Sequence, residues 1–231
     1  MIKNKKVLAI IPARAGSKRL KNKNILELNG KPLIGWTIDA ALNSQYVDDI
    51  FVSTDDESIA EYAINCGVLV PELRPEYLAS DNATTESVIR YILDKYRNMA
   101  DIIILLQPTS PLRTQEHINA ALELFLNKKA TSVVSVCKSE HSPLWANTLP
   151  NDFSMNNFIT VESKKRSQDL DTFYRLNGAI YIYDIDLILG TNSLEYNETT
   201  FAYLMDSVSS IDIDTQSDFE YATFCLKKKV K

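Results

Sequence analysis

Short apolar runs alternate with amphipathic stretches over the first 136 residues of the chain. Each run is rich in Val, Ile and Leu and is bounded by polar residues, a pattern typical of strands that are buried on both faces. We expect strands at 7–12 (VLAIIP), 50–53 (IFVS), 68–70 (VLV), 102–106 (IIILL) and 132–136 (SVVSV). Between these runs apolar residues recur every three or four positions, as they do on the buried face of a helix. These positions are Leu33, Trp36, Ala40 and Ala41, then Ile59, Ala63 and Cys66, then Val88, Ile92 and Tyr96, then Ile118, Ala121, Leu122 and Phe125.

Strands that alternate with helices predict βαβ units, and therefore an α/β fold with a mainly parallel sheet. In such sheets ligands bind beyond the carboxyl ends of the strands. Two polar loops follow expected strands, one after Pro12 and the other after Leu106. These two loops are therefore the first candidates for a functional site.

The alternation breaks between residues 138 and 175, a polar stretch with scattered aromatic residues and no clear period. We interpret it as an arm inserted into a single domain that spans residues 1–231. After the arm, alternating patterns predict strands at 179–183, 201–205 and 211–214. Thr215 with Asp218 then resembles a capping box that opens a last helix.

The composition is that of a globular protein. The 231 residues are 45% hydrophobic and 24% charged, which disfavours a disordered or fibrous chain. Cys66, Cys137 and Cys225 are far apart and odd in number, so they fit neither a disulfide framework nor a metal knuckle. The first apolar run is too short for a signal peptide or a membrane span. We therefore expect a cytoplasmic protein that does not bind a membrane.

Positive charge is concentrated near the amino end. The net charge of −5 gives the whole molecule no attraction for nucleic acid, but the first 26 residues hold eight Lys and Arg side chains and no acid. In the loop 13–19 (ARAGSKR), Gly16 allows the backbone to approach a ligand, successive N–H groups can form an anion nest, and Arg14 and Lys18 add charge. This loop suits a triphosphate, although it matches neither GxxxxGK[ST] nor GxGxxG. A solvated basic turn is the alternative.

Two acids lie two residues apart near the carboxyl end. In a strand, Asp212 and Asp214 would point to the same face and repel each other unless a cation lay between them. Mg²⁺ is the natural ion where phosphates are nearby. The alternative is an exposed edge strand with acidic outer positions.

The loop QPTSP at 107–111 follows the most apolar expected strand. Rigid polar groups in that place suit hydrogen bonds to a hydroxylated ligand, and a stiff connector is the alternative. His117 and His141 have no partner pattern, so we assign both to the surface or to structure, which disfavours a histidine base or a zinc site.

Five motifs follow one another along the chain: IIPARAGSKRLKNKN, LRPEYLASDNATT, LLQPTSPLR, YRLNGAIYIYD and SIDIDTQSDFE. Together they resemble the acylneuraminate cytidylyltransferase family, the CMP-sialic acid synthetases, from about residue 6 to residue 225. The first motif and QPTSPLR also resemble the family's CMP-Kdo, legionaminate and pseudaminate relatives. The resemblance implies a Rossmann-like three-layer α/β/α nucleotidyltransferase fold. It also implies a homodimer in which the segment 138–175 is an arm that reaches the partner's site.

The resemblance further implies the site residues. For CTP they are Ala13, Arg14, Gly16, Ser17, Lys18, Lys23, Asn24, Arg74, Ala79, Ser80 and Thr85. For the sugar they are Gln107, Arg166, Arg175 and Tyr181. Asp212 and Asp214 match the family's metal-binding acids, which implies Mg²⁺, with Mn²⁺ as a substitute. Arg14 and Lys18 would stabilise the departing pyrophosphate and complete the catalytic set with the two acids.

The implied reaction transfers CMP from CTP to the anomeric hydroxyl of N-acetylneuraminic acid and releases pyrophosphate. Trp145 stands where some sialic acid enzymes carry a lysine, so legionaminic acid, pseudaminic acid and Kdo stay open as substrates. Two alternatives of a different class are a GT-A-like glycosyltransferase, which also places an acid pair on a metal, and a non-catalytic nucleotide-binding protein. Release of pyrophosphate from CTP distinguishes both from the implied enzyme.

Overall fold

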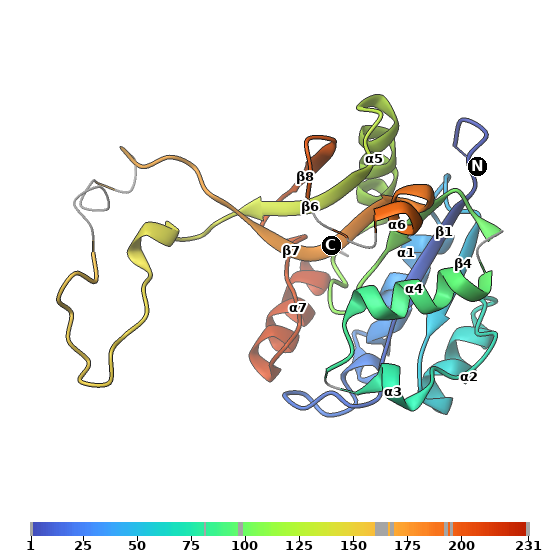
Figure 1. The fold of residues 1–231 in the computed structure, drawn as a ribbon. Helices are drawn as coiled ribbons and strands as arrows, with labels where there is room; N and C mark the ends of the chain where they lie inside the picture. Colours follow the sequence, from blue (N-terminus) through green and yellow to red (C-terminus); the bar gives the residue numbers. More distant parts are fainter. Residues whose placement is uncertain are drawn as a thin grey trace.

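A six-stranded sheet forms the centre of the molecule (Figure 1). The computed structural model describes residues 2–80, 82–96, 99–159, 166, 169–191, 194 and 196–229. Its strands are β1 (Val7–Pro12), β4 (Asp49–Ser53), β5 (Ile102–Leu105), β6 (Ser132–Lys138), β7 (Tyr174–Asp184) and β8 (Thr200–Met205). Their order across the sheet is β4-β1-β5-β7-β6-β8. The pairs β4–β1, β1–β5 and β6–β8 are parallel, whereas β7 is antiparallel to both of its neighbours.

Helices cover both faces of this sheet. One core joins the sheet to α1 (Leu33–Leu42), α2 (Glu57–Asn65) and α5 (Gln115–Asn127). A second core joins the opposite face to α3 (Glu76–Ala79), α4 (Thr85–Tyr96) and α6 (Ile185–Thr191). The predicted three-layer α/β/α fold is therefore confirmed.

The interior strand β1 is apolar throughout because it contributes to both cores. Val7 and Ala9 pack in the first core and Leu8 and Ile10 in the second, as the alternation of side chains along a strand requires. A strand buried on both faces reads as a continuous hydrophobic run, which is why the sequence pattern located it without error.

Helices α2 and α5 both begin at side-chain caps. The Asp56 side chain accepts hydrogen bonds from Ser58 N and Ile59 N at the start of α2, and Gly67 ends the same region with φ +81°. Thr114 caps α5 in a capping box. The predicted strand at 68–70 is wrong, because this segment makes only an isolated bridge between Phe51 and Leu69.

A third, smaller core lies under the last helix. α7 (Gln216–Lys229) packs Ala222, Cys225 and Leu226 against Leu28 and Leu33. Leu28 belongs to β2 (Glu27–Leu28), which pairs with β3 (Lys31–Pro32), and the short helix η1 (Lys23–Ile25) precedes them. This core connects the carboxyl end of the chain to the segment that follows β1.

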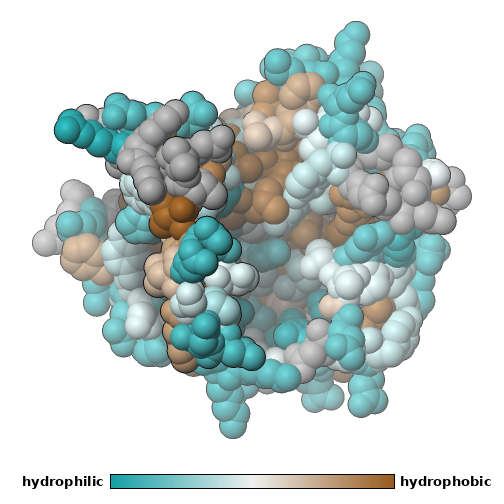
Figure 2. All heavy atoms as spheres, turned by 60° about the vertical axis from the view of Figure 1, so that its left-hand side comes forward, coloured by the Kyte–Doolittle hydropathy of each residue, from teal (hydrophilic) through white to brown (hydrophobic). Residues whose placement is uncertain are grey.

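The segment between β6 and β7 projects from the body as a long arm (Figure 1). Within its described part, the short helix η3 (Pro143–Trp145) is followed by loops and turns. The arm exposes large apolar side chains, and Figure 2, which turns the arm toward the viewer, shows hydrophobic atoms along it.

Candidate active site

A cavity of about 530 Å³ opens at the carboxyl ends of β1 and β5. Its wall is built from the loop after β1, η1, the segment between residues 74 and 88, the loop after β5, and a residue that precedes α7. Five cationic side chains and one carboxylate lie in this wall: Arg14, Lys18, Arg19, Lys23, Arg74 and Asp214. Such an excess of positive charge in a concave site favours a polyanionic ligand.

The basic loop after β1 is held by its backbone. Ala13 N donates to Ser53 O at 2.9 Å, and Ala15 N donates to the Asp55 carboxylate at 2.9 Å. The buried Asn24 donates from Nδ2 to Arg14 O at 3.0 Å. The loop is thus anchored on both sides before any ligand binds, which is the preorganisation that charge recognition requires.

Arg74 adds a buried cation beside this loop. Its Nε donates to Ser53 Oγ at 3.0 Å, and its guanidinium also donates to Ser53 O. Burial, with a smaller contribution from the nearby charge of Arg14, lowers the pKa of Arg74 to about 10. Arg74 therefore stays charged at neutral pH, and an anion in the cavity would relieve its repulsion from Arg14.

The start of α4 lies at the other side of the cavity. Ser80, Thr84 and Thr85 line it, and the Thr84 hydroxyl accepts a hydrogen bond from Ser87 N at 3.1 Å as a helix cap. Ala79 and Gly16 line instead a second hollow, whose wall shares Arg14, Ser17, Lys18 and Ser80 with the cavity.

The acidic segment near the carboxyl end reaches the basic loop. Asp214 forms ion pairs with Lys23 Nζ at 2.9 Å and with the Arg19 guanidinium at 3.1 Å. Lys23 Nζ also donates to Ile213 O at 2.7 Å, and Ile213 N donates to Thr109 O at 2.8 Å. The structure therefore brings both predicted charged segments to one place.

Residues 211–214 do not form the predicted strand, and this prediction is wrong. The segment follows a turn, and Ile213 N bonds to the loop after β5 instead of to a neighbouring strand. Asp214 lines the cavity, whereas Asp212 lies beside it with an exposed residue surface.

Asp212 has a perturbed carboxyl group. The protein atoms around it raise its pKa by desolvation, and the charge of Asp214 acts in the same direction. The Thr109 hydroxyl and the charge of Lys23 lower the pKa of Asp212 and so oppose this shift. The contribution of Thr109 is limited, because its buried Oγ1 does not reach hydrogen-bonding geometry with any described partner. The ionised form of Asp212 is thus disfavoured until a cation approaches.

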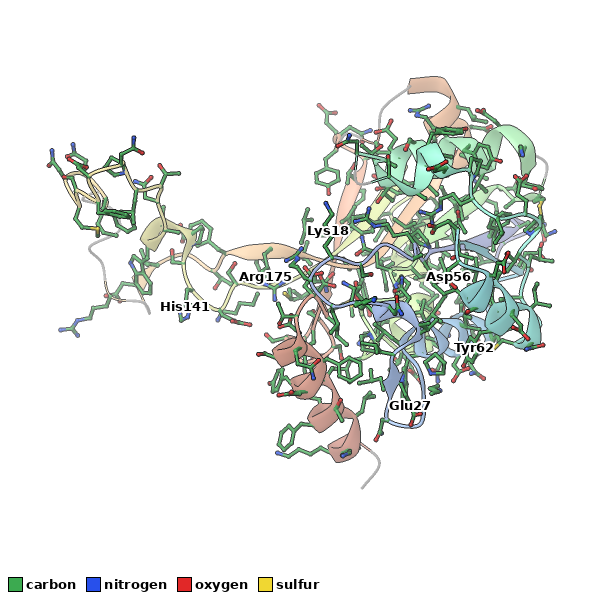
Figure 3. All side chains as sticks on the ribbon, turned by 90° about the horizontal axis from the view of Figure 1, so that it is seen from below. Lys18, Glu27, Asp56, Tyr62, His141 and Arg175 are labelled. Atoms are coloured by element: carbon green, nitrogen blue, oxygen red, sulfur yellow. The ribbon has the colours of Figure 1, made fainter. Side chains whose placement is uncertain are left out.

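The predicted sugar-binding residues are divided between the body and the arm. Gln107 lines the cavity. Tyr181 lies on β7, and burial, Tyr196 and Asp212 raise its pKa, which places it close to the acidic segment. Arg175 lies near the base of the arm and His141 farther out (Figure 3), and neither Arg175 nor the exposed Arg166 lines the cavity.

A family model described as cytidylyltransferase matches residues 8–225, nearly the whole chain. The chain belongs to the cytidylyltransferase family. The chain is 42% identical over 224 residues to a CMP-N,N'-diacetyllegionaminic acid synthase of Legionella pneumophila, with 93% of each chain covered. It is 39% identical to an N-acylneuraminate cytidylyltransferase of Streptococcus agalactiae, of which it covers 52%, with 93% of its own length. This cytidylyltransferase therefore spans about half the length of that relative.

Solved structures support the fold of this cytidylyltransferase. A CMP:2-keto-3-deoxy-manno-octonic acid synthetase in complex with CTP superimposes with a TM-score of 0.74 at 18% identity, covering 97% of this chain and 99% of the other. A 4-diphosphocytidyl-2C-methyl-D-erythritol synthase of Anaerococcus prevotii gives a TM-score of 0.69 at 18% identity, with 98% of each chain covered. These likenesses show the fold. The family model and the sequence relatives show that the protein is a nucleotidyltransferase, as the resemblance of the motifs implied.

The oxygen donors of the cytidylyltransferase site fit a hard divalent cation. Within the described ranges, no three His, Cys, Asp or Glu side chains gather as a complete metal site. Mg²⁺, however, commonly takes one or two carboxylates and completes its shell with substrate phosphates and water. Asp212 and Asp214, whose charges repel each other, would supply two such carboxylates beside the cationic wall.

Sequence reasoning gave no role in the site to two contributors. Asp55 accepts a hydrogen bond from Ala15 N, and Arg19 pairs with Asp214. The position of Asp55 directly after β4 was the available signal, because residues at carboxyl ends of parallel strands meet at one edge of the sheet.

None of the described helices has the length and apolar composition to span a membrane.

Proposed function

We propose that this cytidylyltransferase transfers CMP from CTP to the anomeric hydroxyl of a nine-carbon acidic sugar, N-acetylneuraminic acid. The oxygen of the 2-hydroxyl forms a bond to the α-phosphorus, the bond from that phosphorus to the bridging oxygen breaks, and pyrophosphate leaves. The hydroxyl proton passes to solvent. The observation that carries the proposal is the gathering of five cations and Asp214 around one cavity in a chain whose relatives are cytidylyltransferases.

In this proposal the basic wall binds the triphosphate. Arg14, Lys18 and Lys23 neutralise the phosphates and stabilise the departing pyrophosphate, and Ser80 and Thr85 lie where the nucleoside would enter. Because the loop is anchored before binding, most of the rate arises from positioning and electrostatic stabilisation.

Asp212 and Asp214 would hold Mg²⁺, or Mn²⁺ in its place. When bound, the ion offsets negative charge on the phosphate oxygens. Treatment with EDTA should abolish turnover, and either ion should restore it. Full turnover in EDTA would contradict the metal assignment.

A pyrophosphate-release assay tests which sugar is the substrate. It uses CTP with N-acetylneuraminic acid, legionaminic acid, pseudaminic acid or Kdo. Legionaminic acid is the second candidate, because the Legionella relative has nearly the same length and 42% identity. Release with N-acetylneuraminic acid supports the first proposal, and release with legionaminic acid alone supports the second. Absence of release with every sugar would refute the function.

We also propose a cytoplasmic homodimer in which the arms meet. The arm exposes Leu149, Phe153 and Met155, apolar surface that a second copy would cover, and places Arg166 and Arg175 on a projecting element. Light scattering should give twice the chain mass of 26.1 kDa. Phe153→Asp should produce monomers of low activity, whereas the neighbouring Ser154→Asp adds the same charge without removing apolar surface and should stay dimeric.

A further inference from the structure

Strand β7 departs from regular pairing where it passes the carboxyl end of β5. Its last pair with β5 joins Tyr181 to Leu105. On its other side, four residues of β7, 177–180, lie opposite the single residue Ser135 of β6. Irregularities of this kind redirect side chains and commonly lie beside functional sites. We call Asn177 and Gly178 the β7 corner.

Asn177 is 2% exposed, and both polar atoms of its side chain have partners inside the protein. Its Oδ1 accepts from Ser135 Oγ at 2.5 Å and from Ala179 N at 3.2 Å. Its Nδ2 donates to Ser210 Oγ at 2.8 Å and contacts Met205 Sδ at 3.3 Å. A buried amide with every partner supplied fixes its neighbours in one arrangement.

The bond to Ser210 links the sheet to the acidic segment. Ser210 is fully buried, donates to Asp206 O at 2.6 Å, and lies two residues before Asp212. One residue after Asp212, Ile213 N donates to Thr109 O at 2.8 Å. Asp212 is therefore held between two anchors, and Asn177 provides the first.

Gly178 places the same corner against Gln107. Its φ of +75° is a conformation that favours glycine, and a Cβ at this position would lie 3.3 Å from Gln107 Oε1. The Gln107 side chain thus rests directly over the backbone of the corner.

We propose that the β7 corner is a positioning element that sets Gln107 and the acidic segment at a fixed separation. A sugar held by Gln107 and a triphosphate held beside Asp214 then have the distance and orientation that the transfer requires. This inference rests on the proposed function and adds two residues that act through others, since neither Asn177 nor Gly178 lines the cavity.

A double-mutant cycle tests the Gly178 contact. Gly178→Ala should raise the KM for the sugar about 10-fold while leaving the KM for CTP within about twofold, because the added methyl group displaces Gln107. In a Gln107→Ala background the same substitution should have no further effect on the KM for the sugar. Effects of Gly178→Ala that are the same in both backgrounds would overturn the proposed route through Gln107.

Asn177→Ala tests the link to the acidic segment. We expect kcat to fall about 10-fold and amide hydrogen exchange over residues 206–214 to accelerate. Ser210→Ala cuts the same link from the other side and serves where Asn177→Ala does not accumulate as folded protein. The control is Asn197→Ala, which removes an exposed amide that accepts from Thr199 N at 2.9 Å just before β8 and should change neither kcat nor this exchange.

The two readouts separate this inference from the proposed function. If the wild-type protein releases no pyrophosphate with any sugar, the proposed function fails, while the exchange experiment still tests the corner. If the wild-type protein is active and the Asn177 and Ser210 variants match it in kcat and exchange, the positioning role is refuted.

Discussion

Asp214 offers the sharpest test of the site, because it joins the acidic segment to the basic loop. Its carboxylate is 37% exposed and pairs with the largely buried Lys23 at 2.9 Å and with Arg19, which is 71% exposed. Solvent screening reduces such pairs strongly, so Asp214→Asn should lower the free energy of unfolding by about 1–2 kcal/mol, mostly through Lys23. For a chain of this size the melting temperature would fall by about 2–8 °C. The protein stays folded.

In free-energy terms, Asp214→Asn should reduce turnover more than it reduces stability. Losing one preorganised charged contact typically costs about 10²–10³ in kcat, or about 2.7–4 kcal/mol of transition-state stabilisation. Pyrophosphate release at saturating CTP, sugar and Mg²⁺ measures this loss, and denaturant unfolding measures stability on the same samples.

The matched control is Asp184→Asn. Asp184 pairs with Lys5 at 3.0 Å in a similarly part-buried setting, but at the opposite end of the sheet, where it faces the start of β5. The Asp184→Asn variant should lose about as much stability as Asp214→Asn and should keep its turnover. If Asp214→Asn keeps turnover within about threefold of wild type, or Asp184→Asn loses as much as Asp214→Asn, the catalytic reasoning is wrong.

Three further predictions concern other positions. Asp55→Ala removes the acceptor of Ala15 N and should raise the KM for CTP about 10-fold, whereas the helix-cap variant Asp56→Ala should cost about 1 kcal/mol of stability with an unchanged KM. The pKa of Asp212 is raised in the folded protein, so its ionised form destabilises the fold above that pKa. Asp212→Asn should therefore melt at a higher temperature than wild type at pH 7 and lose turnover. The difference in melting temperature should vanish as the pH falls toward the unfolded-state pKa of about 3.9. Arg113 is 1% exposed and has two nitrogens without hydrogen-bond partners in the described structure. Arg113→Met should therefore leave the free energy of unfolding within about 1 kcal/mol of wild type or increase it. A loss of more than about 3 kcal/mol in denaturant unfolding would contradict this prediction.

The sequence by itself determined the elements that local signals encode. Continuous apolar runs located β1 and β5, helical spacing located the buried face of α5, and the pairing of Thr215 with Asp218 located the start of α7. The position of the basic loop directly after a buried strand was enough to predict a site there. These features depend on residues a few positions apart, so periodicity and capping chemistry suffice to predict them.

The tertiary structure alone decided what depends on distant partners. Residues 211–214 alternate like a strand but pair with no strand among the described residues, and the segment at 68–70 meets β4 only at one bridge, between Phe51 and Leu69. Asp214 meets Lys23 across 191 positions of the chain, and Asp55 reaches the backbone of Ala15 across 40. A hydrophobic pattern states which face of a segment is buried, but a strand also needs a neighbour, and a site needs its loops at one edge of the sheet. Those requirements are met only when the whole chain has packed.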